Sequence, residues 1–232
     1  MAVHTILQKD EVINFLKNYN IDNLERFTGI KEGIENTNYL IETTNKKFIL
    51  TIFEKRVEKN DLPFFFELME HSFDHGINCP RAIVAKNNSR LIDIKNKKCS
   101  LFTFLEGKCI SQWNEKNCYD VGKILGKFHK INSNVVTKKK NHYDIKGWKK
   151  LLKKCGNYMN KMIPDSYDII LNELNFLQSN WPDNLPKGII HADLFPDNVL
   201  FLNNELSGII DFYFSILCFF AFISNFFHKS TF

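Results

Sequence analysis

Residues 188–202 read GIIHADLFPDNVLFL and residues 208–212 read GIIDF, so two strand-like apolar runs carry ionisable side chains within them. An unpaired carboxylate in an apolar environment costs several kcal/mol of folding free energy. Asp193 and Asp211 therefore require a cation, a hydrogen-bond donor or a metal ion close by. Any fold of this chain must bring such partners to both runs, which makes the stretch a candidate functional site.

The composition is that of a globular protein. The 232 residues are 44% hydrophobic and 25% charged, enough for one large domain or two lobes. The formal charge of +5 comes from scattered lysines and one cluster, residues 138–140. We interpret this cluster as a solvated loop, because no aromatic and basic interleaving accompanies it, and we expect no nucleic-acid partner. A basic balance favours an anionic substrate such as a nucleotide.

The six cysteines are widely spaced and form no C-x-x-C pair, which indicates neither a zinc site nor a disulfide framework. Residues 1–10 lack the basic and apolar regions of a signal peptide. We therefore expect a cytoplasmic location. No feature of the sequence predicts an oligomeric state.

The first part of the chain predicts a small antiparallel sheet crossed by one long helix. Apolar spacing predicts helices over residues 9–19 and 61–76, and β-branched and aromatic runs predict strands within 24–56 and 81–107. We place the end of this N-terminal lobe at residue 106.

The second part, residues 107–214, is predicted to be a mainly helical lobe. Helical spacing recurs over residues 119–132, about 146–160 and 166–180, and only then do the apolar strands appear. The order of elements predicts an α+β, two-lobed fold.

Residues 212–227 contain no charge and hold seven of the 22 phenylalanines. Sixteen helical residues span about 24 Å, which is short of the ~30 Å hydrocarbon core of a membrane. A transmembrane span is therefore marginal, and we expect no membrane association. We treat residues 215–232 as an atypical apolar tail.

Phosphoryl transfer from ATP requires a group that deprotonates the acceptor hydroxyl, oxygen ligands for Mg²⁺ and a cover over the phosphates. Asp193 and Asn198 are five residues apart, the separation found in the kinase catalytic loop. Asp211 ends the second apolar run, where a hairpin with residues 198–203 would bring it beside Asn198. Mg²⁺ would neutralise a carboxylate at that place.

Each of these residues also has an ordinary structural interpretation. An isolated Asp-x-x-x-x-Asn is usually a turn whose side chains cap the backbone. His191 alone would more often be a core histidine bonded to a carbonyl. The order His-x-Asp, Asn and Ile-Asp-Phe between strands favours the functional interpretation.

The two motifs resemble the Brenner-type motif of the aminoglycoside phosphotransferase-like kinases, relatives of the protein kinases that phosphorylate small-molecule hydroxyls. Within that family, residues 27–56, 61–71 and 191–214 resemble the homoserine kinase branch, and the likeness runs from near Met1 to about Phe214. The resemblance implies a protein-kinase-like fold, ATP and Mg²⁺ as cofactors, and homoserine as a small-molecule substrate on the route to threonine.

The resemblance also implies roles for individual residues. Asp193 matches the catalytic aspartate and His191 the histidine that braces its loop. Asn198 and Asp211 match the two metal-binding positions.

Further matches concern the nucleotide. Gly29 and Gly33 fall on the turn that covers the phosphates, although GIKEG is not a P-loop and is also compatible with an ordinary hairpin turn. Phe104 and Glu106 fall in the connector, residues 100–106, whose backbone would line the adenine pocket; that segment could equally be plain strand.

One departure concerns the strand lysine that holds the phosphates in protein kinases. Thr51 stands at that position, and Lys55, four strand residues further on, is displaced by ~13 Å. The helix glutamate is matched by Glu67, with Glu70 as an alternative. The threonine could still donate a hydrogen bond to a phosphate.

A second departure concerns the ending. Family members continue for roughly another hundred residues, whereas this sequence turns apolar after Phe214. We hypothesise a truncated or frameshifted product. The alternatives left open are a kinase for another small alcohol, such as choline or an aminoglycoside, an inactive nucleotide-binding remnant, and a membrane-associated fragment anchored by residues 212–227.

Overall fold

The computed structural model describes residues 3–31, 35–54, 57–137, 139–156 and 158–223. The chain divides into two compact units. Unit 1 comprises Met1–Ile131 and Asp193–Ser215, and unit 2 comprises Asn132–Ala192 and Ile216–Phe232. The predicted lobe boundary at residue 106 lies inside unit 1, so this division does not test it and it remains a prediction.

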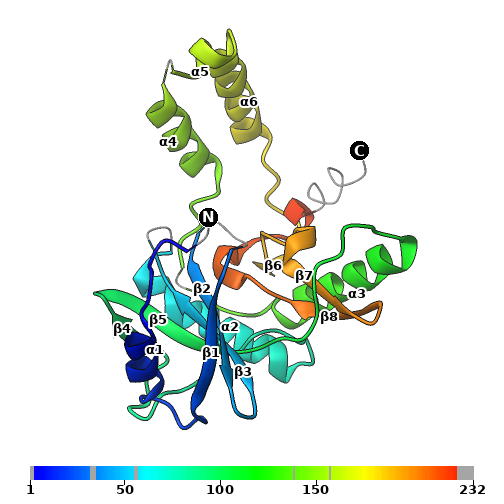
Figure 1. Cartoon of the computed structure of the whole chain (residues 1–232). Coiled ribbons are helices and arrows are strands. Elements are labelled where there is room, and N and C mark those ends of the chain that lie inside the picture. Colours follow the sequence, from blue (N-terminus) through cyan, green and yellow to red (C-terminus); the bar gives the residue numbers. More distant parts are fainter. Residues whose placement is uncertain (1–2, 32–34, 55–56, 138, 157, 224–232) are drawn as a thin grey trace. The chain divides into compact units, whose positions relative to one another are not determined.

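The N-terminal region forms a five-stranded antiparallel sheet, as predicted (Figure 1). Its strand order is β1-β2-β3-β5-β4. The strands are β1 (Leu24–Ile30), β2 (Thr37–Thr43), β3 (Lys47–Ile52), β4 (Ile92–Ile94) and β5 (Lys97–Thr103). The predicted strand region from residue 81 contributes only a single bridge at Ala82 before β4 begins.

The two faces of this sheet pack against different helices. Tyr39, Ile41 and Leu50 are buried in one hydrophobic cluster with Phe15 and Leu16 of α1 (Lys9–Leu16). On the other face, Phe102 packs against Phe66 of α2 (Leu62–Asp74), with ring centroids 5.8 Å apart. Full burial of each large apolar side chain contributes about 1.5–3 kcal/mol, so alternation along the strands fixes which face meets which helix.

Unit 1 also contains α3 (Glu115–Ile131) and the hairpin of β7 (Val199–Leu202) and β8 (Glu205–Ile209). Asn203 and Asn204 join the two strands with φ values of 51° and 64°. A two-residue hairpin loop needs positive φ at both positions, and asparagine tolerates this conformation well. The hairpin predicted from the apolar runs is therefore present.

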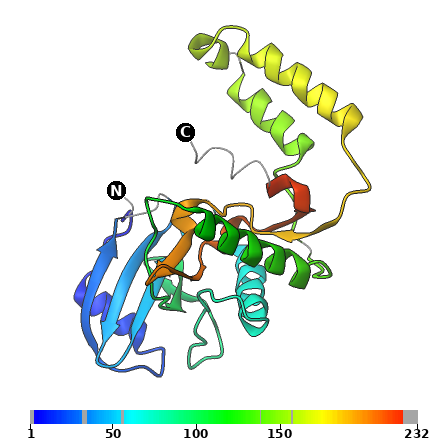
Figure 2. The same cartoon turned by 90° about the vertical axis from the view of Figure 1, so that its right-hand side faces the viewer.

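Unit 2 contains the helices α4 (Ile145–Cys155), α5 (Tyr158–Met162) and α6 (Ser166–Asn180). Figure 2 shows α4 and α6 side by side. The predicted helix over 146–160 ends at Cys155, because Gly156 adopts a φ of +52° that stops it. Strand β6 (Lys187–Ile190) pairs antiparallel with β9 (Ile216–Phe219).

The described part of the charge-free segment contains no long helix. It forms a 3₁₀ turn (Phe212–Phe214), strand β9 and a second 3₁₀ turn (Phe220–Ile223). Two further 3₁₀ turns span Lys59–Asp61 and Pro196–Asn198. Within the described ranges, no helix combines the length and the apolar character needed to cross a bilayer.

Candidate active site

The loop from Asp193 to Asn198 is closed by its own side chains. The Asn198 amide donates to the Asp193 carboxylate Oδ2 at 3.0 Å and to the Asp193 carbonyl at 2.7 Å. A 3₁₀ turn at Pro196–Asn198 leads directly into β7. The five-residue spacing therefore serves to bring the Asn198 side chain back onto Asp193.

The β7–β8 hairpin brings Asp211 to the same place. Val199 pairs with Ile209, and the Ile210 amide donates to the Asn198 carbonyl at 3.0 Å. Asp211 itself has φ 63° and ψ 66°. Few residues other than glycine adopt this left-handed conformation, which often accompanies functional sites.

The two aspartates share a crowded, partly buried environment. Burial, followed by the nearby Asp211 charge, raises the pKa of Asp193 to about 7. Burial raises the pKa of Asp211 to about 6, with repulsion from Glu35 and Asp197. The Oδ1 atom of Asp211 is buried and accepts no hydrogen bond within the part of the chain that the structure describes.

These features fit a magnesium ion that is shared with a phosphate group. The Asn198 amide nitrogen is used by Asp193, which leaves its Oδ1 oxygen as a possible ligand, and Oδ1 of Asp211 is a second oxygen without a hydrogen-bond donor among the described residues. Among the described residues, no group of three or more His, Cys, Asp or Glu could hold a metal ion alone. Mg²⁺ needs only one or two protein oxygens when phosphates and water complete its shell.

His191 is fully buried at the end of β6. It belongs to unit 2, whereas Asp193 begins the second segment of unit 1. Between them, Ala192 has a φ of 63°. The backbone therefore turns sharply between the histidine and the aspartate of the motif.

The two predicted glycines have different outcomes. Gly29 lies in β1 opposite Tyr39, and an added Cβ there would come 2.9 Å from Cγ2 of Val3. Close packing against Val3 therefore accounts for glycine at this position. Gly33 lies outside the described residues.

Thr51 and the predicted helix glutamate, Glu67, lie in different environments and do not form the ion pair that a lysine and a glutamate make in protein kinases. Thr51 is buried on β3, and its hydroxyl donates to Oδ1 of Asn38 at 2.7 Å. Glu67 is exposed on α2. The alternative, Glu70, lies 3.4 Å from Arg81 and 3.8 Å from Arg90. Lys55 lies outside the described residues.

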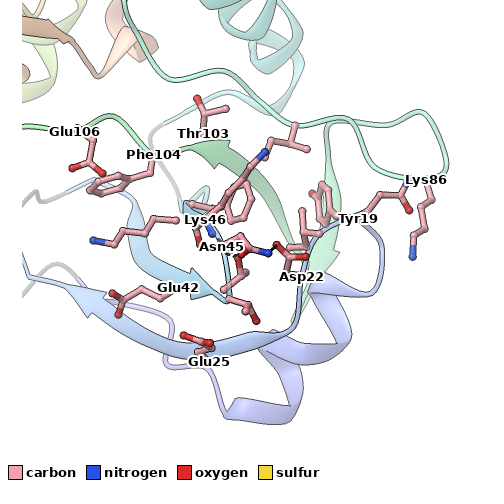
Figure 3. A pocket seen from close by; sticks show the side chains of 17 residues that line it. Tyr19, Asp22, Glu25, Glu42, Asn45, Lys46, Lys86, Thr103, Phe104 and Glu106 are labelled. Carbon is pink, nitrogen blue, oxygen red and sulfur yellow. Dashed lines mark hydrogen bonds between the residues drawn. The ribbon is translucent and has the colours of Figure 1, made fainter.

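Phe104 and Glu106 line a cavity of about 1180 Å³ next to the end of β5 (Figure 3). Its wall also includes the β2–β3 turn, where Asn45 donates to Asp22 at 3.0 Å. Lys47 lies 5.6 Å from the ring centre of Phe104. The Glu106 carbonyl accepts a hydrogen bond from Ser207 of β8, which ties the connector to the hairpin.

Sequence reasoning missed two residues that meet Thr51. Asn38 is its partner in the β2–β3 register, and the Tyr213 hydroxyl forms a hydrogen bond with it. Tyr213 follows Asp211 by two residues and packs edge-on against Phe53 and Phe65 at 5.4 and 5.7 Å. The signal that could have found Asn38 is the pairing register of β2 and β3, which is set by the length of the turn between these two strands.

Known proteins resemble this chain over most of its length. Residues 26–218 match the phosphotransferase enzyme family. The homoserine kinase of Rhizobium rhizogenes is 43% identical over 215 residues, which cover 93% of this chain and 67% of that protein. The homoserine kinase of Bartonella tribocorum is 42% identical over 222 residues, covering 96% and 70%. The chain thus spans about two thirds of the length of these relatives.

Two solved structures share the fold at low sequence identity. The amicoumacin kinase hAmiN, in complex with AMP-PNP, Ca²⁺ and Ami, has a TM-score of 0.73 and 16% identity, covering 93% of this chain and 66% of that one. Spectinomycin phosphotransferase, in complex with ADP and spectinomycin, also has a TM-score of 0.73 and 16% identity, covering 96% and 74%. The predicted α+β, kinase-like fold is confirmed. The chain belongs to the phosphotransferase enzyme family.

Proposed function

We propose that this protein transfers the γ-phosphoryl group of ATP to the side-chain hydroxyl of L-homoserine, giving O-phospho-L-homoserine and ADP, a step of threonine biosynthesis. The observation that carries the proposal is the convergence of Asp193, Asn198 and Asp211 on one loop and hairpin. The acceptor is inferred from the homoserine kinases that are 42–43% identical to this chain.

Asp193 is the proposed general base. A base works best when its pKa lies near the working pH, and burial beside Asp211 raises the pKa of Asp193 to about 7. The Asn198 amide donates to Oδ2 of Asp193 and so orients the carboxylate that would accept the proton of the acceptor hydroxyl. His191, buried at the end of β6, is the proposed brace of this loop.

Asn198 and Asp211 are the proposed ligands of Mg²⁺, which would neutralise charge on the phosphates when bound. Leu40 and Ile49, half-buried on the face of the sheet that carries Thr51, offer an apolar surface to the adenine ring. The segment from Gly29, near the end of β1, to Gly33 is the proposed cover of the phosphates, and Phe104 and Glu106 are the proposed connector beside the adenine. Residues 1–106 would then form the nucleotide-binding lobe.

The test is turnover of MgATP by the purified chain with homoserine, measured beside choline and an aminoglycoside. Homoserine-dependent release of ADP is expected. Turnover with choline or the aminoglycoside but not with homoserine would show that the protein is a kinase for another small alcohol. Absence of turnover with every acceptor would contradict the proposed function.

Asp193→Ala separates chemistry from binding. A general base contributes about 10²- to 10⁴-fold, so kcat should fall by that factor while ATP still binds. Asp197→Ala is the matched control, because Asp197 is an exposed carboxylate in the same loop. Turnover retained in Asp193→Ala would refute the assigned role.

A further inference from the structure

The strand position that usually carries a phosphate-binding lysine holds a buried threonine in this protein. Thr51 is 4% exposed, and its hydroxyl hydrogen is donated to Asn38 Oδ1 at 2.7 Å. A hydroxyl has one hydrogen to donate. While this bond is made, Thr51 has no hydrogen left for a phosphate oxygen.

Tyr213 supplies the other hydrogen bond of Thr51. Because the Thr51 hydrogen is directed at Asn38, its oxygen accepts from the phenol of Tyr213. The phenol of a tyrosine is protonated at neutral pH, so Tyr213 has a hydrogen to donate. The edge-on rings of Phe53 and Phe65 hold the tyrosine in place.

Asn38 stands at the end of this chain of hydrogen bonds. Its Oδ1 oxygen accepts from Thr51, and its Nδ2 group donates to no other side chain or backbone group in the described ranges. Asn38 is half-buried on β2, opposite Thr51 in β3 and Ile30 at the end of β1. It therefore lies on the strand between Ile30 and Thr51, at the β1 side of the residues that contact Tyr213.

The direction of the hydrogen bonds makes Asn38 a donor toward an anion. Successive bonds from Tyr213 to Thr51 and from Thr51 to the Asn38 oxygen polarise the amide, which strengthens its remaining N–H groups as donors. Hydrogen bonds to a charged acceptor are worth more than neutral ones.

We propose that the Asn38 amide donates to a phosphate oxygen of the nucleotide, and that Thr51 and Tyr213 are positioning residues that orient it in place of a lysine. This inference rests on the proposed use of ATP but not on the identity of the acceptor. The donor in this contact is an uncharged amide. It contacts the phosphates and makes no contact with the adenosine part of the nucleotide.

The experiment measures the binding of MgATP and of adenosine to the full chain by calorimetry. Asn38→Ala should weaken MgATP by about tenfold or more and leave the affinity for adenosine unchanged. Asn23→Ala is the matched control, because Asn23 is an exposed asparagine just before β1. This variant should bind both ligands as the parent does.

The positioning residues are tested by removing and restoring hydroxyl groups. Thr51→Val and Tyr213→Phe keep the shape of each side chain and should weaken MgATP in the same direction as Asn38→Ala. Thr51→Ser restores the hydroxyl and should recover most of the affinity. Recovery by serine separates a hydrogen-bonding role from packing.

Three results would overturn the inference: parent-like MgATP affinity in Asn38→Ala, an equal loss of adenosine affinity in that variant, or equal effects of Thr51→Val and Thr51→Ser. A parent protein that binds MgATP but phosphorylates no homoserine refutes the proposed function and leaves this inference intact. A parent protein that binds no MgATP refutes both.

Discussion

Asp211 combines a left-handed backbone, a buried carboxylate oxygen without a hydrogen-bond donor in the described ranges, and a pKa raised to about 6. None of these features stabilises the fold at neutral pH. They are explained if the side chain serves a ligand, because strain and desolvation persist at positions where function requires them.

The raised pKa of Asp211 predicts a pH-dependent effect of Asp211→Asn. The folded state binds the Asp211 proton more tightly than the unfolded state, whose carboxyl has a pKa near 3.8. The stability that comes from this group is thus complete below pH 3.8 and is lost as the pH rises through about 6. Asp211→Asn avoids that loss, so it should be more stable than the parent at pH 8, by on the order of 1–3 kcal/mol.

Urea unfolding in the presence of a chelator, at pH 5 and pH 8, measures this difference. The advantage of the variant should be larger at pH 8 than at pH 5. Asp183→Asn is the control at an exposed carboxylate outside the site and should show no such trend. An equal advantage of Asp211→Asn at both pH values would refute the electrostatic explanation.

At single residues, the sequence predicted what is local and missed what depends on register. Asp193 and Asn198 meet because they share one loop, and the hairpin that carries Asp211 follows from two adjacent apolar runs. The contact of Thr51 with Asn38 and Tyr213 joins three distant segments. No spacing in the sequence encodes that contact, because it depends on strand pairing and on the packing of the 3₁₀ turn at Phe212–Phe214.

Among the elements, the β7–β8 hairpin is positioned by a close backbone contact. An added Cβ at Gly208 would lie 2.2 Å from the Asn78 carbonyl, which also accepts a hydrogen bond from Ile209 at 3.1 Å. The Asn78 side chain in turn donates to the Ser207 carbonyl at 2.7 Å. The loop after α2 therefore fixes the position of the β7–β8 hairpin, which leads to Asp211.

This contact predicts opposite effects of two glycine substitutions. Gly208→Ala should cost about 3 kcal/mol, the upper end of overpacking costs, because the clash is with backbone that cannot swing aside. Gly122→Ala, in the middle of α3 with nothing within 4 Å of the added Cβ, should gain roughly 0.5–1 kcal/mol. Thermal unfolding of both variants checks the prediction, and a Gly208→Ala variant as stable as the parent would contradict it.

Helical periodicity predicted the presence of the helices better than their ends, since α1 ends at Leu16 where residue 19 was predicted, and α3 begins at Glu115 where residue 119 was predicted. The predicted helix over 166–180 is α6 with the same bounds. The predicted helix over 146–160 is interrupted at Gly156, whose left-handed conformation cannot be inferred from apolar spacing. A glycine inside an amphipathic pattern is compatible with either a continuous helix or a stop, and tertiary packing decides between them.

At the scale of the whole molecule, large apolar side chains of unit 2 remain exposed. Seven on and beside α4, α5 and α6 are each more than a third exposed: Leu151, Tyr158, Met162, Ile163, Ile169, Ile170 and Phe176. Exposed apolar groups of this number favour association with other surfaces. The apolar spacing predicted helices in this region, but it did not predict that these apolar side chains would be exposed.

The exposed set predicts concentration-dependent self-association. The double variant Ile169→Asn with Phe176→Asn should have a lower weight-average mass than the parent at high protein concentration. Val136→Asn is the matched control, since Val136 is 94% exposed and lies outside these helices. Light scattering across a concentration series measures the difference. Equal association of the parent and the double variant would show that these side chains do not drive it.

Unit 1 is assembled from two stretches of chain with residues 132–192 between them. Phe128 packs against Phe212, and Phe53 and Phe65 pack against Tyr213, so the first stretch relies on rings from the second. A ribosome releases the first stretch well before the second. These phenylalanines therefore lack their partners from the second stretch during synthesis, and transiently exposed apolar surface of this kind favours aggregation until residue 215 has left the exit tunnel.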